Sequence, residues 1–142
     1  MISSKKPIRL LGIITIIVLV IALSACAEKP EPEYASSITE GILQASKTGN
    51  YAQYSEHFDE AMKNAMPESV FNQTNLAIKA KVGDYTSKEF WKVETQGQYT
   101  AVYYKAKFKQ EPGDVIVKIV FQDIAGKIYV SGLWFDSPNL RK

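Results

Sequence analysis

The sequence of 142 residues has one cysteine, Cys26, and one histidine, His57, and these low counts exclude several kinds of site. An intramolecular disulfide needs two thiols, and a zinc site built from thiolates or imidazoles needs several such side chains. The sequence also lacks a Gly-rich phosphate loop and a G-x-S-x-G nucleophile elbow. We therefore expect no metal ion and no cofactor.

An excess of positive charge is also lacking once the first 25 residues are set aside. The whole chain has 17 basic and 15 acidic residues, but Lys5, Lys6 and Arg9 all precede Cys26, and no acidic residue does. The chain from Cys26 onward therefore has a formal net charge of −1. Nucleic-acid-binding surfaces usually show a basic excess, so we expect no nucleic-acid partner.

The first 26 residues have the parts of a bacterial export signal. A basic segment ends at Arg9, an uncharged apolar segment follows over residues 10–23, and Ser24 and Ala25 are the small residues that a signal peptidase requires before its cleavage site. Leu23-Ser24-Ala25-Cys26 resembles a lipobox, in which the cysteine thiol accepts a diacylglyceryl group. We predict that residues 1–25 are a cleaved signal peptide and that Cys26 is the lipid-bearing first residue of an extracytoplasmic lipoprotein.

A transmembrane anchor is the alternative interpretation of the same segment. The uncharged run covers residues 10–25, which is shorter than the ~20 residues that a spanning helix usually needs. A lipid anchor with two or more acyl chains would hold the protein on a membrane stably. Whether this is an inner or an outer membrane stays open.

Residues 26–34 are predicted to be a tether. Pro30 and Pro32 alternate with three glutamates, which disfavours a packed element. An extended Pro-rich chain reaches ~3.1 Å per residue, so this segment is expected to lift the folded domain roughly 25 Å from the anchor.

Helical patterns follow the tether. Ser37 and Glu40 fit a capping box at the start of a first helix, which Gly49 ends. A second helical stretch begins near Asn50 and has one apolar stripe at three- or four-residue spacing: Tyr51, Tyr54, Phe58, Met62 and Met66. The stripe is typical of residues that pack into a core.

A third helix is predicted from Pro67, a favoured first residue of a helix, to Gly83. Its expected apolar face consists of Val70, Phe71, Thr74, Ile78 and Val82.

From Asp84 onward the hydrophobic period changes to two, which predicts four strands joined by short turns. Helices followed by an antiparallel meander indicate an α+β fold, with the domain at residues 35–136 and a tail at 137–142. The lysines at 105, 107, 109 and 118 are expected to point into solvent. The helix-facing side is expected to hold Glu89, Trp91, Val93, Val102, Tyr104, Ala106, Phe108, Val115, Val117, Ile119, Phe121, Tyr129, Leu133 and Phe135.

Several short motifs, in this order, resemble a known family. They are Gly49-Asn50-Tyr51, Phe58-Asp59, Met62-Lys63, Pro67, Gly83-Asp84-Tyr85, Gly126-Lys127-Ile128 and Gly132-Leu133-Trp134-Phe135. The pattern is similar to that of domain of unknown function 3887 and covers roughly residues 38–135. The resemblance implies a cone typified by nuclear transport factor 2, in which a bent antiparallel sheet wraps over helices and often leaves a pocket. It implies no activity, because the family has none assigned.

Three functional hypotheses remain open, and we favour a non-enzymatic binding module in a monomeric protein. In this hypothesis a small apolar ligand, or a segment of a partner protein, enters an aromatic cone lined by Tyr54, Phe58, Trp91, Tyr104, Phe121 and Phe135. Because a small domain has little apolar surface to spare, we expect the interior to be mostly filled.

The second hypothesis is a small enzyme with Glu89 as a carboxylate base and Tyr104 as a nearby hydrogen-bond donor. This role would require burial of Glu89, because burial raises a carboxyl pKa toward neutrality. The third is an accessory lipoprotein that docks a partner through its surface. His57 is expected to be a surface residue beside the core stripe.

Overall fold

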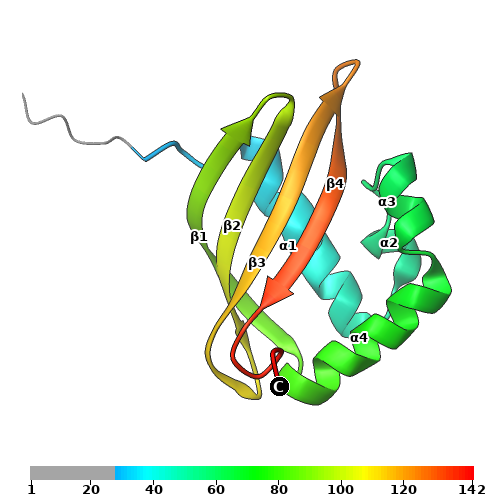
Figure 1. Ribbon diagram of the computed structural model, residues 1–142, viewed down its shortest axis with the longest axis vertical. Helices are drawn as coiled ribbons and strands as arrows, with labels where there is room; N and C mark the ends of the chain where they lie inside the picture. Colours follow the sequence, from blue (N-terminus) through cyan, green and yellow to red (C-terminus); the bar gives the residue numbers. More distant parts are fainter. Residues whose placement is uncertain (1–27) are drawn as a thin grey trace, which may run out of the picture.

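Helices precede strands in the computed structural model, which describes residues 28–142 (Figure 1). The strands form one antiparallel sheet in the order β1-β2-β3-β4, so the predicted α+β architecture is confirmed. The predicted signal peptide and Cys26 lie outside the described residues. The elements are α1 (Glu33–Thr48), α2 (Tyr51–Tyr54), α3 (Glu60–Ala65), α4 (Glu68–Val82), β1 (Tyr85–Gln96), β2 (Tyr99–Phe108), β3 (Glu111–Ile124) and β4 (Lys127–Asp136).

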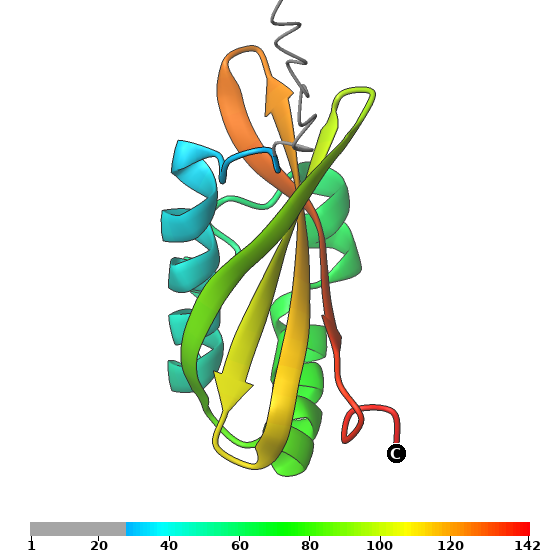
Figure 2. The same cartoon turned by 90° about the vertical axis from the view of Figure 1, so that its left-hand side faces the viewer.

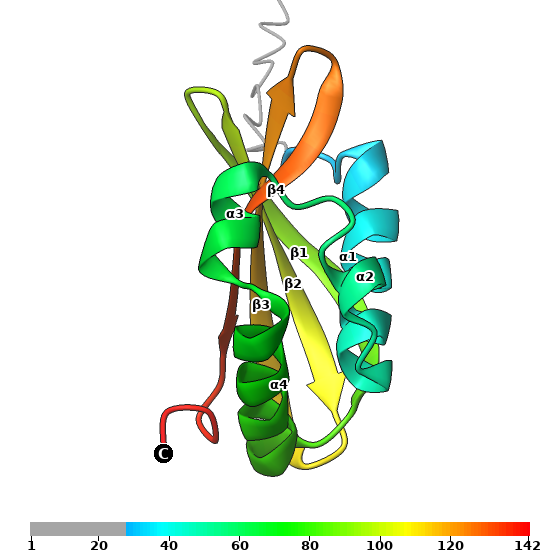
Figure 3. The same ribbon diagram turned by 90° about the vertical axis from the view of Figure 1, so that its right-hand side faces the viewer.

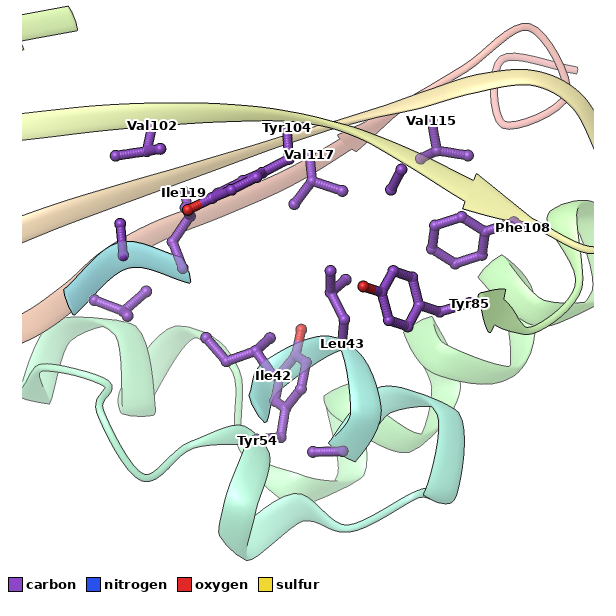
Figure 4. Packing of buried hydrophobic residues seen from close by; sticks show 14 of the residues in the cluster. Ile42, Leu43, Tyr54, Tyr85, Val102, Tyr104, Phe108, Val115, Val117 and Ile119 are labelled. Atoms are coloured by element: carbon purple, nitrogen blue, oxygen red, sulfur yellow. The ribbon is translucent and has the colours of Figure 1, made fainter. Parts of the chain in front are cut away.

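The helices lie on one side of a strongly twisted sheet. α1 crosses the inner face (Figure 2), and α4 lies along the β4 side of the molecule (Figure 3). Ile42 and Leu43 of α1 point toward the alternating aliphatic side chains of β3, as Figure 4 shows. Alternate residues of β2 and β3 are buried there, as expected for one face of a pleated strand: Val102, Tyr104, Ala106, Phe108, Val115, Val117, Ile119 and Phe121.

The first helix begins earlier than the capping-box pattern predicts. α1 starts at Glu33 with Pro32 at its N-cap. The Ser37 hydroxyl donates a hydrogen bond to the Tyr34 carbonyl oxygen, 3.2 Å away, and Glu40 bonds other side chains. The capping box is therefore wrong, and the helix takes two residues that had been assigned to the tether.

Burial of apolar surface explains the early start of α1. The extra turn buries Ala35 completely and places the Tyr34 ring edge-on to Phe121, with ring centroids 5.1 Å apart. Upstream of the helix, Glu31 accepts a 2.5 Å hydrogen bond from the Tyr104 hydroxyl. The second half of the predicted tether is thus fixed to the domain.

The second apolar stripe does not form one helix. It is divided between α2 and α3, because Phe58 forms an isolated bridge with Val130 of the edge strand β4. Asp59 then caps α3, and its side chain accepts a hydrogen bond from the Met62 backbone N–H at 2.7 Å. Pairing with β4 supplies the backbone hydrogen bonds that a continuous helix would have made. The predicted helix ends at Gly49 and Gly83 are confirmed.

A β-bulge in β1 makes the predicted inner face of that strand wrong. The register passes from Phe90 opposite Tyr104 to Lys92 opposite Tyr103, and Trp91 has no partner. A bulged residue reverses the alternation of side chains beyond it. Glu89, which precedes the bulge, pairs with the outward-facing Lys105, and the Trp91 ring stands edge-on to that of Tyr103, so both lie on the outer face. Beyond the bulge, Val93 pairs with the buried Val102. Only Val93 of the three predicted residues faces the helices.

A second bulge in β4 corrects another assignment. Phe121 pairs with Val130 and Val120 with Gly132, which leaves Ser131 unpaired. Val130 is consequently the buried residue, and Tyr129 does not share the inner face with Leu133 and Phe135.

Candidate functional site

The interior of the cone is occupied by its own side chains. Tyr104 and Phe121, which were expected to line a pocket, are fully buried, with Phe121 only 1% exposed. Ile42 and Leu43 occupy the space between α1 and the sheet (Figure 4). A ligand in this position would have to displace part of the packed core.

Polar side chains hold the N-terminal segment and α1 to the strands. Tyr85 donates a hydrogen bond to Glu40 at 2.7 Å, and Lys88 donates one to Ser36 at 2.7 Å and lies over the Tyr104 ring. Burial, followed by the hydrogen bond to a glutamate, raises the pKa of both the Tyr85 and the Tyr104 hydroxyl. These tyrosines are therefore neutral hydrogen-bond donors that position α1.

An apolar groove of about 310 Å³ opens between α4, β4 and the C-terminal residues. It lies beside the core, because Leu133 and Phe135 line it from the inner side of β4. Among the residues that line it there is no carboxylate, histidine or lysine. They are Tyr54, Met66, Thr74, Ile78, Leu133, Trp134, Phe135 and Leu140.

The C-terminal residues form one wall of this groove because they are anchored to the domain. Leu140 packs against the core, and the Glu111 carboxylate accepts a hydrogen bond from the Asn139 backbone N–H at 3.1 Å. The Ser137 hydroxyl and this N–H hold the pKa of Glu111 below its ordinary value. The predicted tail is therefore an ordered part of the domain.

A cleft with a mixed lining lies at the turn between β3 and β4. Its volume is about 380 Å³, and Phe58 contributes to it from the segment before α3. Charged and apolar side chains alternate around it: Asp59, Glu60, Lys63, Ile124 and Tyr129.

The outer face of the sheet carries a row of alternating rings and ammonium groups across the four strands. Lys92, Tyr103, Lys118 and Trp134 are direct neighbours in the strand register, and Trp91 stands beside them at the bulge. We call these five residues the outer-face row. The Lys92 ammonium lies 4.5 Å from the Tyr103 ring centroid, and that of Lys118 lies 5.0 Å from the Trp134 ring centroid.

Both indoles of the outer-face row are accessible to solvent. Trp91 is 40% exposed and Trp134 is 52% exposed. The Trp134 ring lies over Gly132, where a Cβ atom would collide with the indole. This close approach gives a reason for glycine at position 132, because a side chain there would displace the ring.

A hollow of about 450 Å³ adjoins the row near the β1–β2 turn. Glu94 lies in it and accepts hydrogen bonds from the Lys92 ammonium at 2.5 Å and from the Tyr103 hydroxyl at 2.9 Å. These hydrogen bonds lower the pKa of Glu94 and keep it a carboxylate. Charged side chains, Glu94 and Lys118, line the hollow, in contrast to the groove.

The residues predicted to line one pocket are distributed over four places. Tyr54 and Phe135 line the groove, Phe58 lines the mixed cleft, Tyr104 and Phe121 lie in the core, and Trp91 lies on the outer face. Glu89 is exposed on the outer face, opposite to the face that Tyr104 occupies.

The sequence patterns did not place Trp134, Ile78 and Leu140 at a candidate site, although all three line the groove. Trp134 follows Leu133 and precedes Phe135, so strand alternation does indicate that its ring faces away from the helices. For Leu140 the sequence offers no signal, because its place beside α4 depends on the Glu111 contacts.

The comparisons with known proteins address the whole domain. The family described as "Protein of unknown function (DUF3887)" matches residues 39–128. The chain belongs to this family. The resemblance inferred from the ordered short motifs is therefore confirmed. No curated protein matches the sequence.

Several solved structures are similar to this DUF3887 domain. A variant of the protein Rd1NTF2_05 has a TM-score of 0.50 at 10% identity, with 72% of this chain and 96% of the other covered. An NTF2-like protein of unknown function from Cytophaga hutchinsonii gives 0.40 at 12% identity, with 80% and 100% covered. A putative polyketide cyclase from Sinorhizobium meliloti gives 0.42 at 16% identity, with 70% and 94% covered. The first of these likenesses shows the NTF2-like cone.

In residues 28–142 there is no helix with both the length and the apolar character needed to cross a membrane.

Proposed function

We propose that this DUF3887 protein is a membrane-anchored, extracytoplasmic binding module that holds a small apolar ligand in the groove between α4 and β4. The observation that carries the proposal is the groove itself. Its volume of about 310 Å³ lies near the lower end of the range of ~300–1,000 Å³ that is usual for ligand sites.

The chemistry of the lining favours binding over catalysis. Tyr54 is the side chain of the groove that can ionise, and burial raises the pKa of its hydroxyl further above the neutral range. It is therefore a neutral ring at physiological pH. The aliphatic and aromatic side chains of the groove would gain from excluding water, whereas a charged ligand would find no partner among them.

Titration with an uncharged apolar fluorophore, N-phenyl-1-naphthylamine, tests this site. Ile78→Arg places a charged side chain in the groove and should weaken probe binding several-fold. Leu76→Arg is the matched control, because Leu76 lies on the same helix and is 69% exposed. Equal probe binding by both variants and the parent would reject the groove as the site.

Native mass spectrometry of the protein purified from its own envelope then asks what the groove holds. A retained small molecule that is absent from the Ile78→Arg variant supports the proposal. A retained peptide or protein would replace the small ligand with a segment of a partner.

The anchor in this proposal is supported by the lipobox-like sequence at Cys26. Cys26→Ala should leave an uncleaved precursor without added lipid, because the thiol is the acceptor. Labelling of cells with a radioactive fatty acid, followed by immunoprecipitation, measures the outcome. Normal cleavage and lipidation of the variant would reject the assignment.

The enzyme alternative has no support in the geometry. A general base at Glu89 needs a buried carboxylate near a donor, and Glu89 is exposed on the face of the sheet opposite to Tyr104.

Docking of a partner protein is the second candidate, because the outer-face row exposes two indoles beside lysines. Aromatic and positively charged side chains of this kind favour an acidic segment of an envelope protein. If Trp91→Ala abolishes capture of a partner while Ile78→Arg does not, the outer face is the functional surface, because Trp91 does not line the groove.

A further inference from the structure

The link between the proposed lipid anchor and the folded domain is short. Glu31 is hydrogen-bonded to Tyr104, and α1 begins two residues later. Only residues 27–30 separate Cys26 from Glu31. An extended chain spans at most ~3.6 Å per residue, so the Cα atoms of Cys26 and Glu31 lie within roughly 18 Å of each other. The roughly 25 Å spacer expected from the sequence is therefore too long.

The described chain begins at one end of the molecule, and the same end carries two hairpin turns. The β1–β2 turn at residues 97–98 and the β3–β4 turn at residues 125–126 both lie there, away from the C-terminus (Figure 1). Figure 2 shows the same arrangement from the side. A short link at this end keeps these turns near any membrane that holds the lipid.

One exposed apolar side chain adjoins each turn, at the start of β2 and at the end of β3. Tyr99 is 41% exposed and Ile124 is 43% exposed. In the β3–β4 turn, Ala125 has a φ of 54°, in the left-handed region where asparagine, aspartate or glycine is usual. Alanine thus stands at a position of the turn where the backbone conformation favours other residues.

We infer that the two hairpin turns at the lipidated end, with Tyr99 and Ile124 at their bases, contact the headgroup region of the anchoring membrane. This inference rests on the proposed lipid at Cys26. Tyrosine is favoured at the interface between headgroups and acyl chains, because its ring is apolar and its hydroxyl is polar. The exposed Tyr99 and Ile124 side chains would enter the interface without a requirement for anionic lipids. The groove and the C-terminus would then face away from the bilayer surface.

Site-specific fluorescence on the full lipidated protein tests this orientation. An environment-sensitive fluorophore is attached to Ile124→Cys or Gln98→Cys, one in each turn. Gly113→Cys serves as the control at the opposite end, because no atom lies within 4 Å of a Cβ built there. In lipidated protein the Cys26 sulfur is alkylated, so the introduced thiol is the one that reacts. The protein is reconstituted into phosphatidylcholine vesicles that contain nitroxide-labelled lipid.

The expected result is several-fold stronger nitroxide quenching of the probes at 98 and 124 than of the probe at 113, with the opposite order for quenching by aqueous iodide. Equal quenching at all three positions in protein with a confirmed lipid mass on Cys26 would overturn the inference and leave the anchor intact. Protein without lipid on Cys26 would overturn the anchor, and the inference with it.

Insertion of a flexible Gly/Ser linker after Ala27 provides a second test with the same probes. A longer link removes the restraint on distance, so quenching by lipid nitroxide at position 124 should fall. Unchanged lipid quenching at position 124 after the insertion would contradict the role of the short link.

Discussion

The two faces of the sheet have similar side chains and opposite environments. Tyr104 on the inner face is fully buried under α1, whereas its neighbour Tyr103 on the outer face stands among lysines. Both hydroxyls donate hydrogen bonds to glutamates, Tyr104 to Glu31 and Tyr103 to Glu94. The inner face is a filled core, and the outer face keeps its rings in contact with water. The comparison indicates that open surfaces for binding lie at the margin and on the outside of this cone.

The largest expected effect is the loss of a ring from the inner face. Phe121→Ala should lower the free energy of unfolding by ~3–5 kcal/mol, because it removes buried surface and leaves a cavity. Trp134→Ala, which removes a larger ring from the outer face, should cost only about 1 kcal/mol or less. Denaturant titration of both variants gives the two values. A loss below about 1 kcal/mol for Phe121→Ala would contradict the filled core.

The paired tyrosines give a finer comparison with a smaller effect. Tyr104→Phe removes the hydroxyl that holds Glu31, and we expect a loss of about 1.5 kcal/mol, at the lower end of the range for hydrogen bonds to charged groups. Tyr103→Phe should cost less, because water replaces its hydroxyl at an exposed carboxylate. Equal losses in thermal or denaturant unfolding would show that the faces do not differ in this way.

The carboxylates near the C-terminus extend the comparison to pH. Glu111 is buried and its pKa is lowered in the folded protein. Its contribution to the free energy of unfolding is therefore complete above the ordinary carboxyl pKa of about 4.3, and it is lost as the pH falls through the lower folded-state pKa. Glu111→Gln should therefore destabilise the protein at pH 7, and the difference from the parent should shrink in acid. Asp136→Asn, which loses an exposed pair with Arg141, should have a smaller effect at pH 7. Urea titrations across this pH range measure the stability of both variants. If the difference in stability between the parent and Glu111→Gln grows on acidification, the prediction is contradicted.

The smallest expected effect concerns the ammonium groups of the outer-face row. Lys118→Ala removes contacts with the Tyr103 and Trp134 rings, and exposed cation–π contacts contribute ~0.5–1 kcal/mol. Lys107→Ala is a control on an exposed lysine of the same strand pair that contacts Asp114. The difference in the free energy of unfolding between the parent and Lys118→Ala should be larger than that between the parent and Lys107→Ala. It is measured at low and at high salt. No measurable change would mean that the row has no role in stability.

The sequence by itself determined the order of the elements and much of the core. A period of two fixed which residues of β2 and β3 face the helices, since a strand that slips by one residue exposes its whole apolar set. Glycines at 49 and 83 fixed the ends of α1 and α4, because their φ angles of 73° and 77° suit glycine. The ordered short motifs also sufficed to find the family.

Only the tertiary structure decided the features that create the candidate sites. The bulges at Trp91 and Ser131 arise from pairing between strands, so no period within a single strand reveals them. The early start of α1 depends on Phe121, nearly 90 residues away in the chain, and the groove depends on the contact between Glu111 and Asn139. Local patterns report which side chains avoid water, whereas the positions of openings depend on contacts between residues that are far apart in the sequence.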